Sequence, residues 1–212
     1  MDKTEDGQSC KRPYDLGKRQ EASDRTRDAV LAAARAQLET SGVRDLTMEM
    51  LARASGVTRQ TIHNLFGTRR AVLEALFDRM AMDAGMMRMR EVMTVREPAS
   101  MLAAFVEVFT GFWAKDRLLL RRIHGIAAID PEFGRVVEAR NERRKMAATR
   151  VIERLYAGRP EVDAEEKTRK VACLTALTSF EFFDALAETS ADSALAEGCV
   201  YPLVKRAIAL GE

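Results

Sequence analysis

Residues 47–66 constrain the fold of this chain more than any other stretch. They contain two short helical patterns separated by a turn at Gly56. Glycine takes positive φ at no steric cost, so Gly56 suits a sharp change of direction between two helices. Thr47 and Thr58 each precede one pattern and can cap its free backbone N–H groups. The layout predicts a helix-turn-helix unit, in which two short helices pack across a tight turn.

The second of these helices carries polar side chains that can bond DNA. A helix-turn-helix places its second helix in the major groove, where Arg can bind guanine and Gln can bind adenine. Arg59, Gln60 and Thr61 are therefore predicted base contacts, with a solvated helix face as the alternative. The remaining predicted DNA contacts are Thr47, Thr58, His63, Asn64 and Arg69.

Positions on both sides of the motif extend the pattern. The positions that match are Thr26, Val30, Leu31, Ala33, Ala34, Leu38, Gly42, Leu46, Thr47, Met48, Leu51, Ala52, Ala54, Gly56, Val57, Thr58, Ile62, Phe66, Arg69 and Leu73. With them, residues 26–76 resemble the N-terminal domain of the TetR family of one-component transcriptional regulators. The family usually has Tyr where His63 stands and Lys where Arg69 stands, and Arg69 keeps the charge.

Composition favours an all-α fold. Only 12 Gly and 5 Pro occur in 212 residues, while Ala, Leu, Met, Glu and Arg abound and strand-like alternation is scarce. Apolar spacing and helix-stop residues predict about nine helices. Besides the two of the motif, these helices cover residues 24–40, 68–95, 99–114, 118–128, 131–156, 164–188 and 193–210. Pro202 is expected to kink the last of them.

The chain divides into three parts on this reading. Residues 1–22 form a basic arm that we expect to be mobile, as either a DNA-tracking segment or, more simply, a solvated tail. Residues 23–70 form the DNA-binding domain, and residues 71–212 form a helical regulatory and dimerisation domain. Residues 11–70 hold twelve Lys/Arg against seven Asp/Glu, which fits a DNA-facing end.

Two stripes of apolar residues mark a candidate ligand pocket. One follows residues 82–93 and the other follows residues 102–113, both at helical spacing. Core packing explains such stripes, but methionine also suits a pocket that adapts to its ligand, and the resemblance implies an effector site there. The candidate ligand-binding residues are Met82, Met86, Met89, Met93, Phe105, Phe109, Phe112, Trp113, His124 and Glu181.

Two polar members of this set have open roles. His124 is either a group that orients a ligand or a satisfied core histidine. Glu181 stands among phenylalanines, and if it faces inward it can pair with a cationic ligand or with Arg140. If Glu181 faces outward, it is simply solvated.

The resemblance implies a repressor that leaves a near-palindromic operator when a small, largely apolar effector binds. It also implies a homodimer formed through the last two helices. A DNA-binding regulator without a small ligand, controlled by a partner or acting as an activator, is the main alternative. An enzyme or carrier is remote, because the sequence has two histidines and no nucleophile elbow, phosphate loop or metal-ligand spacing.

Other features agree with a cytoplasmic regulator that needs no cofactor or metal. No apolar run approaches the roughly 18 residues of a membrane span, and the N-terminus has no apolar signal segment. Cys10, Cys173 and Cys199 are widely spaced and are expected to be reduced thiols, the last two as small core residues.

Overall fold

The computed structural model describes residues 16–40, 46–160 and 162–208. These residues form helices and connecting turns without a strand, which confirms the all-α prediction. The helices are α1 (Leu16–Thr40), α2 (Met48–Ser55), α3 (Arg59–Phe66), α4 (Arg69–Asp83), the 3₁₀ turn η1 (Met86–Arg88), α5 (Met89–Val92), α6 (Pro98–Lys115), α7 (Arg117–Ile129), α8 (Pro131–Leu155), α9 (Ala164–Leu177), α10 (Phe180–Ser190) and α11 (Ser193–Ala207).

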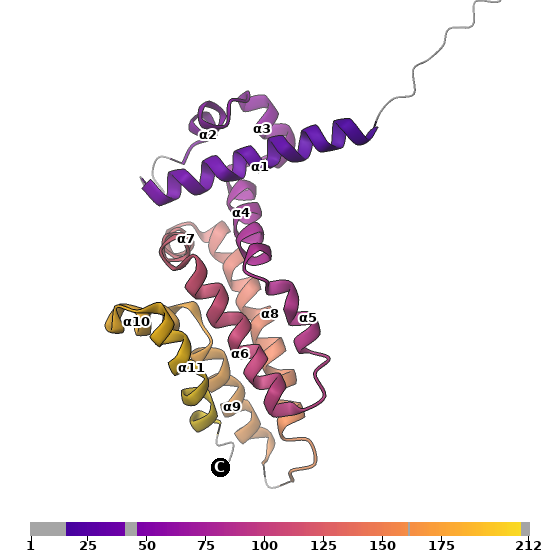
Figure 1. Cartoon of the computed structure of the whole chain (residues 1–212), viewed down its shortest axis with the longest axis vertical. Coiled ribbons are helices and arrows are strands. Elements are labelled where there is room, and N and C mark those ends of the chain that lie inside the picture. The colour runs from indigo at the N-terminus through magenta and orange to yellow at the C-terminus, as the bar shows by residue number, and fades with distance from the viewer. Residues whose placement is uncertain (1–15, 41–45, 161, 209–212) are drawn as a thin grey trace, which may run out of the picture.

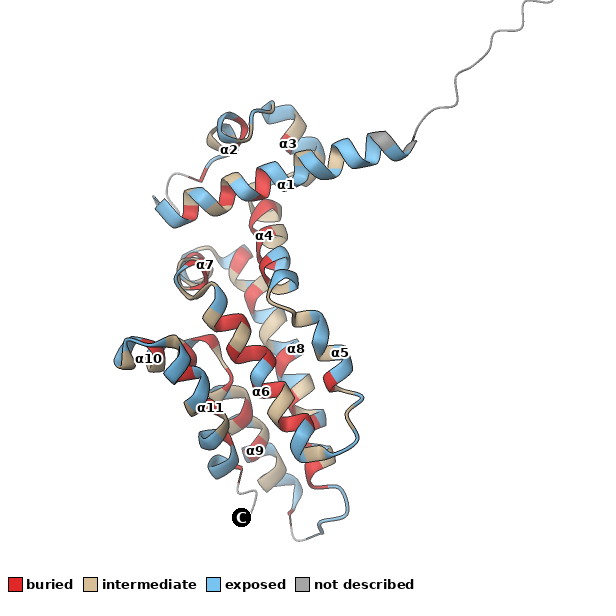
Figure 2. Ribbon diagram, in the orientation of Figure 1, coloured by how far each residue is buried: buried red, intermediate tan, exposed pale blue. Residues whose placement is uncertain are grey.

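The helices form two packed regions joined by α4. Helices α1, α2 and α3 lie together at one end of the molecule, and α4 leads from them toward a bundle containing α6, α8, α9 and α11 (Figure 1). Buried residues lie along the inner faces of both regions (Figure 2). No helix among the described residues is long and apolar enough to cross a membrane.

The predicted helix-turn-helix is present, and the expected residues cap it. Thr47 Oγ1 accepts a hydrogen bond from Met50 N at 3.1 Å, and Thr58 Oγ1 accepts one from Thr61 N at 3.1 Å. Gly56 has φ 69° and closes α2 with a bond to Ala52 O. The core of this region is formed by fully buried Val30, Ala34, Leu38, Leu46, Leu51 and Ile62.

Two long predicted helices are interrupted in the structure. The helix expected over 68–95 ends at Asp83, and the chain turns at Gly85 with φ 76° before η1 and α5. The helix expected over 164–188 stops at Leu177, because Ser179 caps a new helix by accepting a bond from Phe182 N at 3.1 Å. Apolar spacing continues across both breaks, so periodicity alone did not reveal them.

Other boundaries also differ from expectation. Helix α1 begins at Leu16, so residues 16–22 of the expected arm are helical, whereas residues 1–15 lie outside the described residues. Helix α11 continues through Pro202 to Ala207. Gly42, expected to end the first helix, and Cys10 lie outside the described residues. Cys173 and Cys199 are free and half-buried.

Polar contacts join the helix-turn-helix region, α1 to α4, to the bundle. Arg35 of α1 donates to Asp116, just before α7, with Nη1 at 3.2 Å from Oδ2. Arg122 of α7 donates to the carbonyl of Leu38 at the end of α1. Arg70 of α4 forms an ion pair with Glu132 of α8, with Nη1 at 3.5 Å from Oε2. We call these three connections the interdomain contacts.

Candidate functional site

The outer face of α3 presents four of the predicted DNA contacts to solvent. Arg59, Gln60, His63 and Asn64 are exposed, and Thr61 is half-buried. The opposite face carries Ile62, which is fully buried in the core. Because Ile62 fixes the rotation of the short helix, the polar face is held outward, as a groove-reading helix requires.

Several of these side chains bond one another. Gln60 Nε2 donates to Asn64 Oδ1 at 2.8 Å, one helical turn along α3. The hydroxyls of Thr58 and Thr61 are 2.8 Å apart. A group that approaches this face must replace or extend these local bonds, whereas Arg59 makes no such bond within the described residues.

Arg69 lies at the junction rather than on the α3 face. Its Nη1 donates to Leu46 O at 3.5 Å, and Nη2 lies 4.0 Å from Asp130 Oδ2, in the turn between α7 and α8. Arg27 of α1 was not predicted as a functional residue, yet its guanidinium lies 4.5 Å from the centre of the Phe66 ring at the end of α3. Both arginines brace the helix-turn-helix.

A cavity of about 410 Å³ lies between α4, the η1–α5 segment, α6, α7 and α8. Seven of the ten candidate ligand residues line it: Met82, Met86, Met89, Phe109, Phe112, Trp113 and His124. Met93, Phe105 and Glu181 do not. Phe105 is fully buried and packs edge-to-face on Phe109, with ring centres 5.0 Å apart, so it supports the wall from behind.

Glu181 faces His124. His124 Nδ1 lies 3.0 Å from Glu181 Oε1, and this hydrogen bond lowers the pKa of Glu181 to about 2. The side chain of Glu181 is nevertheless 66% exposed, so its carboxylate lies at the surface of the protein, on the solvent side of His124. The suggested pairing of Glu181 with Arg140 is wrong, because Arg140 of α8 donates to Asp78 of α4 instead.

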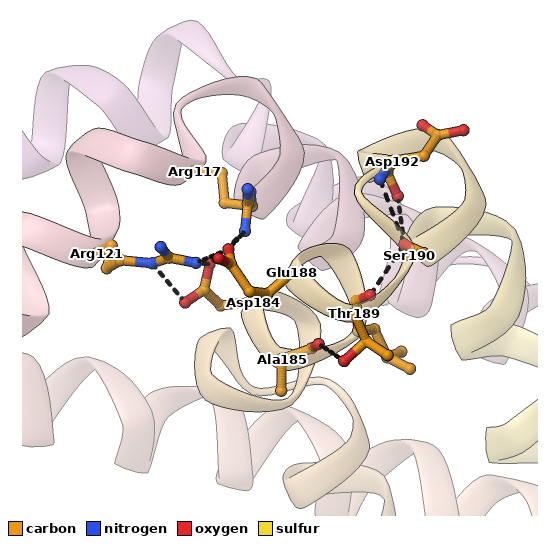
Figure 3. Close-up of polar contacts among 9 residues, drawn as sticks. Arg117, Arg121, Asp184, Ala185, Glu188, Thr189, Ser190 and Asp192 are labelled. Carbon is orange, nitrogen blue, oxygen red and sulfur yellow. Dashed lines mark hydrogen bonds and ion pairs between the residues drawn. The ribbon is translucent and has the colours of Figure 1, made fainter.

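Ion pairs between α7 and α10 hold the His124–Glu181 pair in place. Arg121 of α7 grips Asp184 of α10 with two bonds of 2.8 and 2.9 Å, and Arg117 reaches the same carboxylate at 2.9 Å (Figure 3). Arg117 and Arg121 also bond Glu188, and these bonds lower the pKa of its carboxyl group. Arg121 lies one turn from His124 on α7, and Asp184 lies one turn from Glu181 on α10. The two contacts therefore hold the same stretches of α7 and α10 together.

Sequence reasoning missed the wall of the cavity that α8 supplies. This wall consists of Val137, Arg140, Asn141, Arg143, Arg144 and Ala147. Helix α8 is rich in charge, and its sequence predicts a helix over 131–156 without indicating a cavity wall. A signal was nevertheless present, because Arg144 falls in the apolar stripe that runs through Val137, Ala148 and Val151 at helical spacing.

Comparisons with known proteins agree with this architecture. Residues 30–76 match the family model described as bacterial regulatory proteins of the tetR family. A comparison with curated proteins gives no significant match.

Among solved structures, the fold is similar to three proteins of low sequence identity. A TetR transcription regulator from Haloarcula marismortui is 16% identical, with a TM-score of 0.65 over 88% of this chain and 97% of that chain. NalD, the secondary repressor of the MexAB-OprM multidrug efflux pump in Pseudomonas aeruginosa, is 18% identical, with a TM-score of 0.63 over 87% and 97%. A protein from Saccharomonospora viridis, described as a transcriptional regulator in complex with choline, is 16% identical, with a TM-score of 0.62 over 86% and 96%.

The matched segment runs from the second part of α1 through α2 and α3 into the first half of α4, and so includes α3, the helix that carries the exposed polar face. Residues 30–76 therefore carry the helix-turn-helix region of the TetR family of bacterial regulatory proteins, and the helical fold of the remainder is similar to that of solved TetR-family regulators.

Proposed function

We propose that this regulator is a homodimeric repressor that binds a near-palindromic operator and leaves it when a small molecule fills the cavity. The observation that carries the proposal is the position of α4. This helix follows α3 after a two-residue turn, and its Phe77, Ala81 and Met82 line the cavity. A ligand in the cavity therefore touches the helix that directly supports the recognition helix.

The coupling between ligand binding and operator release requires only a small difference in free energy. If the two recognition helices of a dimer stand about 34–36 Å apart, they meet successive major grooves on one side of the duplex. A ligand that binds a conformer with another spacing more tightly shifts the population toward it. Differential affinity of about 1–3 kcal/mol gives a roughly 5- to 150-fold loss of operator affinity.

A regulator that answers only to a partner protein is the second candidate. A regulator of this kind needs no ligand site, so its core between α4 and α8 would be fully packed. A cavity lies there instead, lined by Met82, Phe109 and Val137 among others. The choline complex of the Saccharomonospora viridis protein is a precedent for a small molecule on this fold. Both points favour a ligand-responsive regulator over one without a ligand.

The proposed dimer forms through the C-terminal helices. Helix α11 carries Leu195 and Leu203 with 54% and 37% of their surfaces exposed, which is unfavourable for a free monomer surface and suits an interface with a second copy. Substituting both residues with Glu is expected to convert the dimer to a monomer in light-scattering measurements. An unchanged mass would place the interface elsewhere.

The DNA-binding proposal is tested by titrating the protein on a duplex of the region upstream of its own gene, over a salt series. The wild type is compared with a double variant, Arg59→Ala with Gln60→Ala, and with the control Arg150→Ala, an exposed arginine of α8. We expect specific wild-type binding that weakens steeply with salt, is lost in the double variant and is retained in the control. If no genomic duplex is bound better than random DNA, the repressor function is refuted.

A further inference from the structure

One arginine of the cavity wall is buried without an acidic partner. Arg144 of α8 is only 6% exposed, and no carboxylate of the described residues lies within ion-pair distance of it. Its Nη1 donates to Thr175 O and to Thr178 Oγ1, the latter at 3.3 Å, and its Nη2 donates to Asn141 Oδ1 at 3.3 Å. All three acceptors are neutral.

Arg144 also keeps unused donors. Its Nε is buried and has no hydrogen-bond partner in the described part of the chain. A guanidinium has five N–H donors, and three bonds are made, so Nε–H and one Nη2 hydrogen remain. Two donors on one guanidinium edge match the two oxygens of a carboxylate.

Burial makes this arrangement costly. The pKa of Arg144 is lowered by desolvation, and the charge of Glu181 raises it to a smaller extent. Glu181 does not relieve the burial directly, since its carboxylate is bonded to His124 and faces solvent. A buried charge without a close counter-ion is disfavoured in a protein and is relieved by an anion that binds beside it.

The other charged residues that line the cavity also favour an anionic ligand. Among the described residues, Asp78 is the only acidic one that lines the cavity, and Arg140 already neutralises it. Arg143 adds a further positive charge at an exposed position. His124 also lines the cavity, and its Nε2 is buried and has no partner among the described residues. The polar part of the cavity is therefore cationic, while Met86, Phe109 and their neighbours make the rest apolar.

We propose that the effector of this protein is an amphipathic organic anion, whose carboxylate binds Arg144 and whose apolar body lies against the methionines and aromatic rings. This inference rests on the proposed ligand response and names its chemical class. An uncharged amphiphile leaves the guanidinium unpaired, and a quaternary ammonium compound meets a cation of its own sign.

The chain's single tryptophan is the reporter for a direct test. Trp113 lines the cavity, and its indole N–H donates to Thr178 O at 3.1 Å, so a bound ligand is expected to change its fluorescence. The full-length protein is titrated with decanoate, 1-decanol and decyltrimethylammonium, which share one alkyl chain. Because a hydrogen-bonded ion pair replaces an unpaired charge, we expect decanoate to bind roughly ten- to a hundredfold more tightly than decanol. Decyltrimethylammonium should bind least.

Two variants assign the effect to Arg144. Arg144→Met should reduce decanoate binding to the level of decanol, whereas the control Arg150→Met should leave the ratio unchanged. Arg144 also connects α8 to the end of α9, so Arg144→Met could unfold the protein. Arg144→Lys, which keeps the positive charge, is used in that case and should retain part of the preference for decanoate. Equal or tighter binding of decanol or of decyltrimethylammonium by the wild type overturns the inference, as does an absence of decanoate binding.

The same probes separate this inference from the proposed function. If the protein binds its operator and decyltrimethylammonium releases it while decanoate does not, the repressor function stands and the anionic class is wrong. If decanoate binds with the expected preference but no operator is found, the ligand class stands and the repressor function fails.

Discussion

Gly134 is predicted to permit the close crossing of α7 and α8, which a larger residue would disturb. The two helices are joined by Asp130 alone, and a Cβ added at Gly134 would lie 2.8 Å from the carbonyl oxygen of Ala127. Carbon–oxygen contacts of this kind lie at about 3.3–3.6 Å, so the helices must separate by roughly half an ångström. The obstacle is backbone, which cannot rotate away as a side chain can.

The magnitude follows from two opposed effects. Replacing a helical glycine by alanine favours the helix by about 1 kcal/mol. Overpacking a well-filled contact costs about 1–3 kcal/mol. Gly125 of α7 provides the matched control, since a Cβ there would meet no atom within 4 Å. We therefore expect Gly134→Ala to be about 1–3 kcal/mol less stable than Gly125→Ala.

Thermal and urea unfolding at one fixed protein concentration measure this difference. Gly125→Ala should raise the melting temperature by about 2–4 °C, and the melting temperature of Gly134→Ala should lie below that of the control by about 2–12 °C. The crossing also positions His124 and Val137 on the cavity wall, so the Gly134 variant should bind decanoate more weakly. Two variants of equal stability would refute the reasoning.

Two further predictions concern the cavity and the contact between His124 and Glu181 beside it. Met86→Leu combined with Met89→Leu keeps the apolar volume but removes flexible thioethers from the wall; operator affinity should be unchanged and release by ligand weakened, and an identical release curve would contradict a role for these methionines in the response. The pKa of Glu181 is about 2 in the folded state against 4.5 for a free glutamate, so the His124 contact stabilises the fold above pH 4.5 and loses this effect as the pH falls toward 2. Because the side chain is 66% exposed, Glu181→Gln should cost less than about 1 kcal/mol at pH 6, and the difference from wild type in urea unfolding should shrink below pH 4.5. A difference that stays constant from pH 6 to pH 3 would show that the charge of Glu181 is not its source.

The DNA-binding region was predictable because its determinants are local. A cap such as Thr58, a turn glycine such as Gly56 and a core position such as Ile62 act within a few residues of each other. The order of the helices followed from the same kind of signal, for instance Asp130 and Pro131 at the start of α8, where Asp130 Oδ1 accepts from Glu132 N at 3.0 Å.

The cavity was predicted only in part because it depends on contacts between distant segments. Spacing identified the methionine and aromatic stripes but not which members face a void, so Phe105 and Met93 could not be separated from Phe109 and Met86. Arg144 was overlooked because a charged residue in a charged helix looks solvated until the opposing helices are placed. The site assignments on α3 stay predictions.

The interdomain contacts have a consequence for ionic strength. Arg70 and Glu132 expose 42% and 66% of their side chains, whereas Arg35, which is 37% exposed, is paired with Asp116, which is only 9% exposed, so this second pair is less sensitive to salt. At physiological salt the Debye length is about 8 Å and shortens as salt is added, so exposed pairs of this kind weaken. Added salt is therefore expected to weaken the Arg70–Glu132 pair between α4 and α8 as well as the binding of DNA phosphates. A salt series of operator binding thus reports the counter-ions released from DNA together with the loosening of this contact between α4 and α8.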